Sequence, residues 1–126
     1  MRLIRRVAFA ILLPCFIAIS ACHSYHIDAT IENHTGSAIS LLEVDYPSAS
    51  FGTDVLATDS TFRYRLQTRG SGPVKVQYTA GNGRMVQITG PTLQEKQEGS
   101  IQIILLPDGK ADFRPRLNPT AGTTAR

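Results

Sequence analysis

The chain has 126 residues, of which 42% are hydrophobic and 18% are charged, and its formal net charge is +3. This length leaves room for one domain, and the composition is typical of a globular chain rather than a disordered one. Three of the thirteen basic residues precede residue 7, and from Cys22 onward ten basic residues face ten acidic ones. Nucleic-acid binding needs clustered positive charge, so this neutral remainder argues against a nucleic-acid partner.

The N-terminal segment has the three-part layout of a secretory signal peptide. Residues 1–6 are largely basic, residues 7–19 are apolar and uncharged, and two small residues follow. A transmembrane helix needs about 20 apolar residues to cross the hydrocarbon core of a bilayer. This apolar run has only thirteen and contains Pro14. We therefore expect residues 1–21 to be a signal helix that is removed after export, and not a lasting membrane span.

Residues 19–22 read Ile-Ser-Ala-Cys directly after that apolar run. They resemble the lipobox of bacterial lipoproteins, which has an aliphatic residue, a small residue, Gly or Ala, and then Cys. The resemblance implies that the Cys22 thiol receives a diacylglyceryl group, that the preceding peptide is cut away, and that the new amine is acylated. Two or three acyl chains hold a protein firmly on a membrane, whereas one chain binds only marginally. The alternative is cleavage by the ordinary signal peptidase, which would release a free secreted protein.

The same resemblance bears on the compartment. In lipoproteins of Gram-negative bacteria an Asp directly after the lipidated Cys favours retention in the inner membrane. Here that residue is His23, so the resemblance favours the outer membrane, facing the periplasm or the cell surface. Residues 22–25 would form the lipidated Cys and a short tether. Because Cys15 leaves with the signal peptide, the domain would contain no disulfide, and burial alone would stabilise it.

From residue 26 the chain reads as short strands separated by turns. Alternating apolar and polar residues predict antiparallel strands with one buried face over 61–67 and 73–79. Apolar residues at both parities predict central strands covered on both faces over 38–46 and 101–106. In chain order we expect strands at 26–33, 38–46, 61–67, 73–79, 84–89, 100–106 and 111–117, with a short one near 50–56 if the count is eight.

The turns support this division. Asn-Gly at 82–83 and Asp-Gly at 108–109 favour tight hairpins, because both residues of each pair tolerate positive φ. Further reversals are expected at 34–37 and 70–73. Pro115 assigns the last strand to a sheet edge, because proline cannot donate a ladder hydrogen bond.

Seven or eight short strands in residues 26–117 predict an all-β domain, specifically a single antiparallel β-sandwich. At this level the chain resembles immunoglobulin-like and fibronectin type III-like domains, although it lacks the Cys and Trp landmarks of antibody domains. A small up-and-down β-barrel is the alternative. Residues 118–126 are small and polar, and we expect them to be a disordered tail.

The first strand contains the only cluster of metal-ligand residue types. Two histidines and two carboxylates share one parity, at His26, Asp28, Glu32 and His34. Such groups can bind a divalent metal. In an extended strand, however, His26 and His34 lie about 26 Å apart and cannot share one ion. We expect a solvated strand face, with no metal and no cofactor.

A second candidate is the segment from Tyr46 to Thr53, which we predict to be a loop. Aromatic residues stand near both of its ends, at Tyr46 and Phe51, and small residues lie between. Loops at the end of a sandwich often build binding surfaces, so both residues are candidate ligand contacts. The alternative, which we favour, makes them core residues at strand ends. In the charged segment 90–99 we expect Leu93 to be a packing residue.

No nucleophile, base and orienting group can be assembled from this sequence, and we expect no enzymatic activity. The favoured function is a membrane-anchored, non-enzymatic envelope module that interacts with another envelope protein or polymer, or has a structural role. The alternative is a small-ligand or carbohydrate-binding module that uses Tyr46 and Phe51. An envelope enzyme is the least favoured hypothesis.

Overall fold

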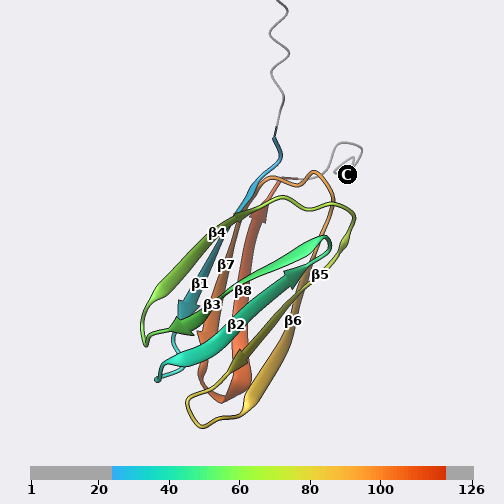
Figure 1. The fold of residues 1–126 in the computed structure, drawn as a ribbon. Helices are drawn as coiled ribbons and strands as arrows, with labels where there is room; N and C mark the ends of the chain where they lie inside the picture. The colour runs from blue at the N-terminus through green and yellow to red at the C-terminus, as the bar shows by residue number, and fades with distance from the viewer. Residues whose placement is uncertain (1–23, 119–126) are drawn as a thin grey trace, which may run out of the picture.

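The computed structural model describes residues 24–118, which form eight strands (Figure 1). They are β1 (Ile27–Asn33), β2 (Ile39–Tyr46), β3 (Ala49–Leu56), β4 (Thr61–Leu66), β5 (Gly72–Thr79), β6 (Met85–Leu93), β7 (Gly99–Leu106) and β8 (Lys110–Leu117). A single 3₁₀ turn, Pro107–Gly109, joins the last two strands. All seven predicted strands are confirmed, and the eighth, near 50–56, is present as β3. The predicted signal helix (1–21) and, apart from Asn118, the predicted tail (118–126) lie outside the described residues.

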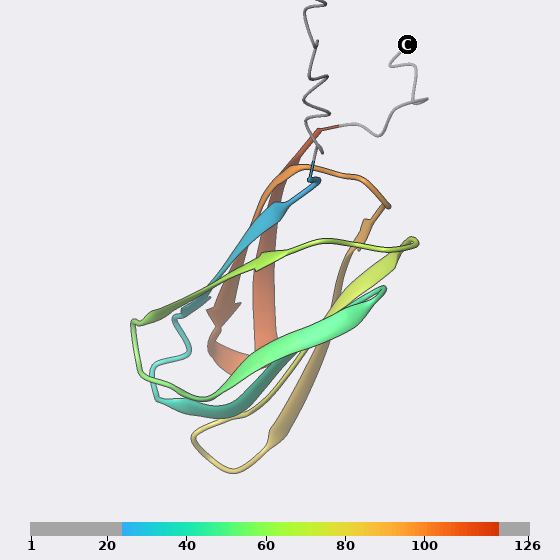
Figure 2. The same cartoon turned by 45° about the horizontal axis from the view of Figure 1, so that its top comes forward.

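The strands form two sheets of four, which pack face to face. Sheet A has the order β4-β1-β7-β8, and sheet B has the order β3-β2-β5-β6 (Figure 2). The predicted β-sandwich is therefore confirmed, and the alternative of a closed barrel is wrong. The start of β1 and the end of β8 lie at the same end of the sandwich, which we call the terminal end (Figure 1). The opposite, distal end carries the β1–β2, β3–β4, β5–β6 and β7–β8 connections.

One strand pair departs from the predicted antiparallel pattern. β1 and β7 pair in parallel, with Ile27 opposite Gly99 and Ile31 opposite Ile103. Successive strands alternate in direction along the chain, so odd-numbered strands all run toward the distal end. Because sheet A places two odd-numbered strands side by side, that pair must be parallel. All other pairs are antiparallel.

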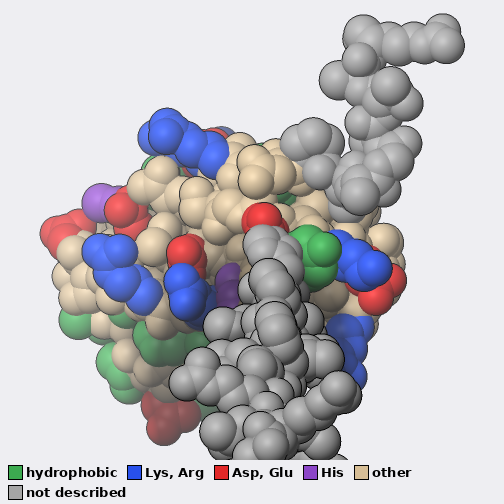
Figure 3. Space-filling view, turned by 90° about the horizontal axis from the view of Figure 1, so that it is seen from above, with side chains coloured by type: hydrophobic (Ala, Val, Ile, Leu, Met, Phe, Trp, Pro, Cys, Tyr) green, Lys and Arg blue, Asp and Glu red, His purple; other side chains and the backbone are tan. Residues whose placement is uncertain are grey.

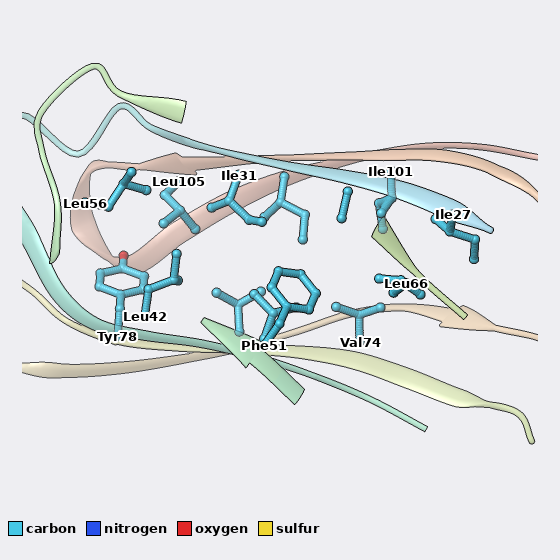
Figure 4. Close-up of a cluster of buried hydrophobic side chains, with 14 of the residues drawn as sticks. Ile27, Ile31, Leu42, Phe51, Leu56, Leu66, Val74, Tyr78, Ile101 and Leu105 are labelled. Atoms are coloured by element: carbon cyan, nitrogen blue, oxygen red, sulfur yellow. The ribbon is translucent and has the colours of Figure 1, made fainter. Parts of the chain in front are cut away.

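The core lies between the two inner faces and is almost entirely aliphatic (Figure 4). On β5 the residues of one parity, Val74, Val76 and Tyr78, are at most 2% exposed, as the alternation predicted. Leu93 is fully buried, so its predicted packing role is confirmed. Each large aliphatic side chain buried in this way contributes roughly 1.5–3 kcal/mol of transfer free energy.

β2 is central in sheet B, as predicted, but only one of its faces is buried. Ile39, Leu42 and Val44 are buried, whereas Leu41 is 66% exposed. Leu41 has a positive φ of 52°, and the pairing with β5 shifts register between Ser40 and Glu43. The extra residue of this β-bulge changes the parity of the buried positions along the strand. The bulge, and not coverage of both faces, explains the apolar residues at both parities.

β7 is central in sheet A, again as predicted, and again one face dominates. Its inward residues Ile101, Ile103 and Leu105 are at most 1% exposed. The outward residues Ile104 and Leu106 are half-buried by their neighbours in the sheet. Both faces of this strand are therefore largely covered, as predicted, although within residues 24–118 no further layer packs on the outside of sheet A.

The β6–β8 side of the sandwich is closed by an aromatic ring packed on a glycine. β6 extends to Leu93, four residues beyond its predicted end, and its pairing with β5 shifts register opposite Pro73 to Lys75. A Cβ added at Gly90 would lie 2.5 Å from the Phe113 ring of β8. A larger residue at Gly90 would therefore have to displace the Phe113 ring from its present position. The predicted edge position of Pro115 is confirmed by the place of β8 in its sheet.

Asn33, the last residue of β1, connects the two sheets at the distal end. Its side chain is fully buried, and its amide nitrogen donates to the carbonyl oxygens of Ser37, Leu56 and Ala57 at 2.8–3.2 Å. Its amide oxygen accepts from the backbone N–H and the hydroxyl of Thr35. Every polar atom of this buried side chain is thus used, which fixes the β1–β2 loop against the end of β3.

Candidate functional site

Cys22, the predicted lipidation site, lies outside the described residues. The described chain begins at Ser24, and β1 begins at Ile27. Only four residues therefore separate Cys22 from the first strand, consistent in length with the predicted tether. Within residues 24–118 no helix is long and apolar enough to span a membrane.

The segment around Tyr46 and Phe51 is a tight hairpin and not the loop that we predicted. Tyr46 ends β2 and pairs with Ala49 of β3, and Phe51 pairs with Val44. The small residues at the start of β3 concealed a strand whose two buried side chains, Phe51 and Leu56, belong to the core. Phe51 is 7% exposed and its ring points into the space between the sheets (Figure 4). This packing corresponds to the core interpretation that we favoured for Phe51.

Four aromatic rings close the β3–β4 side of the sandwich. The Phe51 ring stacks on Tyr64 with centroids 4.3 Å apart, and it lies 6.1 Å from Tyr46 and 6.2 Å from Phe62. Tyr64 remains 40% exposed because β4 is an edge strand. Burial, and then the interaction with the Tyr64 hydroxyl, raises the pKa of Tyr46. The cluster therefore joins the two sheets, and a ligand role for Tyr46 and Phe51 stays a prediction.

The structure separates the two histidines of the first strand, as the strand geometry predicted. His26 precedes β1 at the terminal end and lies 3.3 Å from the Gln67 amide nitrogen. His34 follows β1 at the distal end, where its ring nitrogens lie 3.3 Å from Glu32 and 3.6 Å from Asp59. Within residues 24–118 no group of three or more ligand side chains is arranged to hold a metal ion.

His34 also lacks the arrangement of a general base. Both of its ring nitrogens face carboxylates, one from the end of β1 and one from the β3–β4 connection. A catalytic base needs one nitrogen within hydrogen-bond reach of a nucleophile while the other is oriented by a partner. Among the described residues, neither nitrogen meets a hydroxyl. The exposed His34 ring therefore lies between the carboxylates of Glu32 and Asp59 at the distal end of β1.

A hollow of about 490 Å³ opens at the distal end between the two sheets. Three connections line it, and they contribute Thr35, Ser37, Asn82, Arg84 and Asp108. The Tyr78 side chain forms part of its inner wall, and burial raises the pKa of that hydroxyl. Apolar side chains, among them Val86 and Leu106, also line it, so the hollow has a mixed lining with one cation and one anion.

The outer face of sheet A carries a concentration of arginines that the charge count did not reveal. Arg63 and Arg65 point outward from β4, and Arg114 and Arg116 point outward from β8. All four are exposed. We call these four residues the arginine face. The sequence contained a sign of it in two Arg-x-Arg patterns, since residues two apart in a strand share one face.

The outer face of sheet B has the opposite charge. Glu43 and Asp45 point outward from β2, and Lys75 lies opposite Asp45 on β5. A hydrogen bond with Asp45, together with charge repulsion from it, raises the pKa of the Glu43 carboxyl. At the terminal end the basic side chains are scattered around the rim and mixed with acidic ones (Figure 3). Positive charge is therefore concentrated on a face of the sandwich and not on its terminal end.

No protein-family model matches the chain, and no curated protein sequence matches it significantly. Among solved structures, it is similar to an NMR structure of a protein from Eubacterium rectale, with a TM-score of 0.55. The match covers 79% of this chain and 93% of that chain at 13% identity. At this identity the likeness concerns the fold alone. The chain therefore contains a two-sheet all-β domain with the fold of that protein.

Proposed function

We propose that this protein is a bacterial lipoprotein, anchored to a membrane through lipid on Cys22, whose β-sandwich is a non-enzymatic interaction module of the cell envelope. The observation that carries the proposal is the Ile-Ser-Ala-Cys sequence at 19–22, directly after a short, uncharged apolar run with a basic start. His23 after the cysteine favours the outer membrane, with the domain facing the periplasm or the cell surface.

The described domain is compatible with such an anchor in three respects. The first strand begins within a few residues of Cys22, so the lipid would hold the terminal end close to the bilayer. The core is aliphatic and needs no disulfide, which agrees with a domain that has no thiol after lipidation of Cys22. The long outer faces of both sheets would remain accessible for contacts with other envelope components.

An interaction role is also supported by what the polar groups of the domain do. Asn33, with five side-chain hydrogen bonds, holds the connections between strands at the distal end, and His34 faces two carboxylates. These are structural arrangements and provide no activated nucleophile. The immunoglobulin-like resemblance belongs to this proposal as well, since sandwiches of that kind commonly serve as binding modules on cell surfaces.

The anchor is tested by labelling cells with radioactive palmitate. The wild-type chain should take up palmitate and sediment with membranes, whereas Cys22→Ser should do neither. Cys15→Ser is the matched control, because it replaces the other cysteine of the chain, which lies in the segment that is cut away. This variant should take up palmitate normally. A wild-type chain without label, or a labelled Cys22→Ser chain, would contradict the anchor.

A further inference from the structure

We propose that the arginine face of sheet A binds an anionic polysaccharide. The proposal deepens the envelope-interaction role by naming the class of partner, and it rests on that role only for the extracytoplasmic setting. It stands on four observations: the placement of the arginines on one sheet, their unequal pairing with acids, the side chains between them, and the charge of the opposite face.

The sheet register places the four arginines at the corners of a flat area. Arg63 of β4 lies in one row with Thr30 of β1, Gln102 of β7 and Arg114 of β8. Strands are spaced about 4.8 Å apart, so the two arginine Cα atoms are separated by about 14 Å. The next row lies about 7 Å farther along the strands and consists of Arg65, Asp28, Ser100 and Arg116.

This area has an excess of positive charge. Its two rows contain four arginines and one acid, Asp28, which lies 3.0 Å from the Arg65 guanidinium. Arg114 lies 2.9 Å from Asp112 of the following row. Within residues 24–118, Arg63 and Arg116 have no ion-pair partner. Exposed ion pairs contribute little stability and exchange readily with other anions, so all four guanidinium groups can take part in binding.

The types of side chain favour oxyanions carried on a sugar backbone. All four cations are arginines, whose planar guanidinium groups match carboxylate, sulfate and phosphate groups with two parallel hydrogen bonds. Between them lie the partly exposed residues Thr30, Ser100 and Gln102, which carry hydroxyl and amide groups. These groups can hydrogen-bond to sugar hydroxyls. The area therefore combines cations at its margins with neutral hydrogen-bonding groups at its centre.

Two other anionic partners fit this area less well. Proteins that bind single-stranded nucleic acid on a sheet stack its bases on aromatic side chains. None of the described residues that point outward from sheet A is aromatic. A lipid surface at the anchor would meet the terminal end of the sandwich, where positive and negative side chains are mixed (Figure 3). An extended polymer along the side of the domain suits the arginine face better.

The opposite face of the sandwich strengthens the assignment. Sheet B presents Glu43 and Asp45 close together, which repels an anionic polymer. A polysaccharide would therefore be steered to one side of a domain that carries no net charge from Cys22 onward.

The test measures binding of heparin octasaccharide to the chain from residue 22 onward, carrying Cys22→Ser so that it remains soluble. All eight strands and the core lie within this chain, so it contains the complete fold. In an NMR titration we expect the shifts to concentrate on amides of β1, β7 and the two edge strands of sheet A. Neutral dextran of similar length should cause none. Absence of heparin binding at low salt would overturn the proposal.

The decisive variant is Arg63→Gln with Arg116→Gln, which removes the two members of the arginine face that have no ion-pair partner within residues 24–118. It should weaken heparin binding about tenfold or more, because each lost charge-assisted hydrogen bond has a large effect on affinity. The matched control is Arg69→Gln with Arg84→Gln, which makes the same change of charge outside sheet A. It should weaken binding no more than about twofold. Equal losses in the two double variants would mean that net charge alone attracts heparin, and would overturn the assignment.

Further measurements distinguish polysaccharide binding from lipid binding, from loss of stability and from failure of the anchor. The domain without heparin should not bind vesicles that contain phosphatidylglycerol. Binding to these vesicles but not to heparin would assign the arginine face to lipid instead. Both double variants should keep the wild-type melting temperature, because all four substituted residues are exposed. The anchor is independent of this result: Arg63→Gln with Arg116→Gln in the full chain should still incorporate palmitate.

Discussion

Sheet A and sheet B contribute similarly apolar inner faces to one core, but they differ in backbone regularity and in outer charge. The strands of sheet A pair without a register shift, whereas sheet B has two, one in β2 near Leu41 and one in β6 near Gly90. On the outside, four arginines mark sheet A, and Glu43 with Asp45 marks sheet B.

This difference shows how a neutral domain can possess two unlike surfaces. The count of ten basic and ten acidic residues from Cys22 onward gives the total charge and not how the charges are distributed over the surface. The inner faces must both be apolar because they share one core. The outer faces are not constrained by packing, so they are where charge can be arranged for binding. Three substitutions test the parts of this comparison.

The largest effect is expected from Gly52→Ala, which attacks the bulge of sheet B. A Cβ at this position would lie 1.9 Å from the Leu42 carbonyl oxygen, which is a backbone atom and cannot turn aside. The bulged backbone of β2 would have to shift, so we expect the free energy of unfolding to fall by at least about 3 kcal/mol. Urea denaturation measures this.

The control for that substitution is Ser50→Ala, two residues away on the same strand. Ser50 is exposed, and its replacement should change the free energy of unfolding by no more than about 0.5 kcal/mol. If Gly52→Ala is as stable as the wild type, the close approach of β2 and β3 at the bulge is not a feature of the folded protein.

A smaller effect is expected from Asn33→Ala, which cuts the polar connection between the sheets. The substitution removes the side-chain donor to the carbonyl oxygens of Ser37, Leu56 and Ala57, and the bond to Leu56 is buried. We expect a loss of roughly 2–3 kcal/mol in the free energy of unfolding. Thr68→Val is the control at the other end of the sandwich, because Thr68 is 7% exposed and donates a single bond to Gln94. It should cost about 1 kcal/mol, and equal losses would contradict the special role of Asn33.

The smallest effect is expected from Glu43→Gln on the acidic face of sheet B. Asp45 raises the pKa of Glu43 in the folded state, so the folded protein binds this proton more tightly than the unfolded chain does. Stability from this group is therefore present below its ordinary pKa and is lost as the pH rises through the folded pKa. Glu43→Gln should raise the melting temperature slightly at about pH 7 and leave it unchanged at about pH 3.

The pairing of the two acids can be checked in the same thermal scans. Asp45→Asn should relieve the same repulsion, so combining it with Glu43→Gln should add less than the sum of the two single effects. Fully additive gains would show that the two carboxyl groups do not interact.

Local patterns gave most of the fold. The period-2 alternation correctly predicted which residues of β5 are buried, and Pro115 correctly predicted that β8 is an edge strand. Prediction failed where one residue of a strand departs from the regular pattern. Leu41 reversed the parity of β2, and the small residues of β3 made a strand resemble a loop. Bulges depend on the pairing partner, and a single strand sequence does not contain that information.

The candidate sites also differ in whether they depend on a local sequence pattern or on the pairing of strands. The proposed lipidation site at Cys22 rests on a contiguous lipobox-like motif, so it could be proposed from the sequence alone. The arginine face could not, although each Arg-x-Arg pattern placed its two side chains on one side of a strand. Whether β4 and β8 belong to the same sheet is decided by strand order, and the two pairs of arginines are distant in the chain.

By itself the sequence determined the strands, most of their buried parities and the layout of the first 22 residues, because these depend on neighbouring residues. Only the tertiary structure decided the strand order, the parallel pairing of β1 with β7, the bulges and the separation of charge between the two outer faces. The physical reason is that these features arise from contacts between residues far apart in the chain, whose free energy favours one pairing of strands over the others.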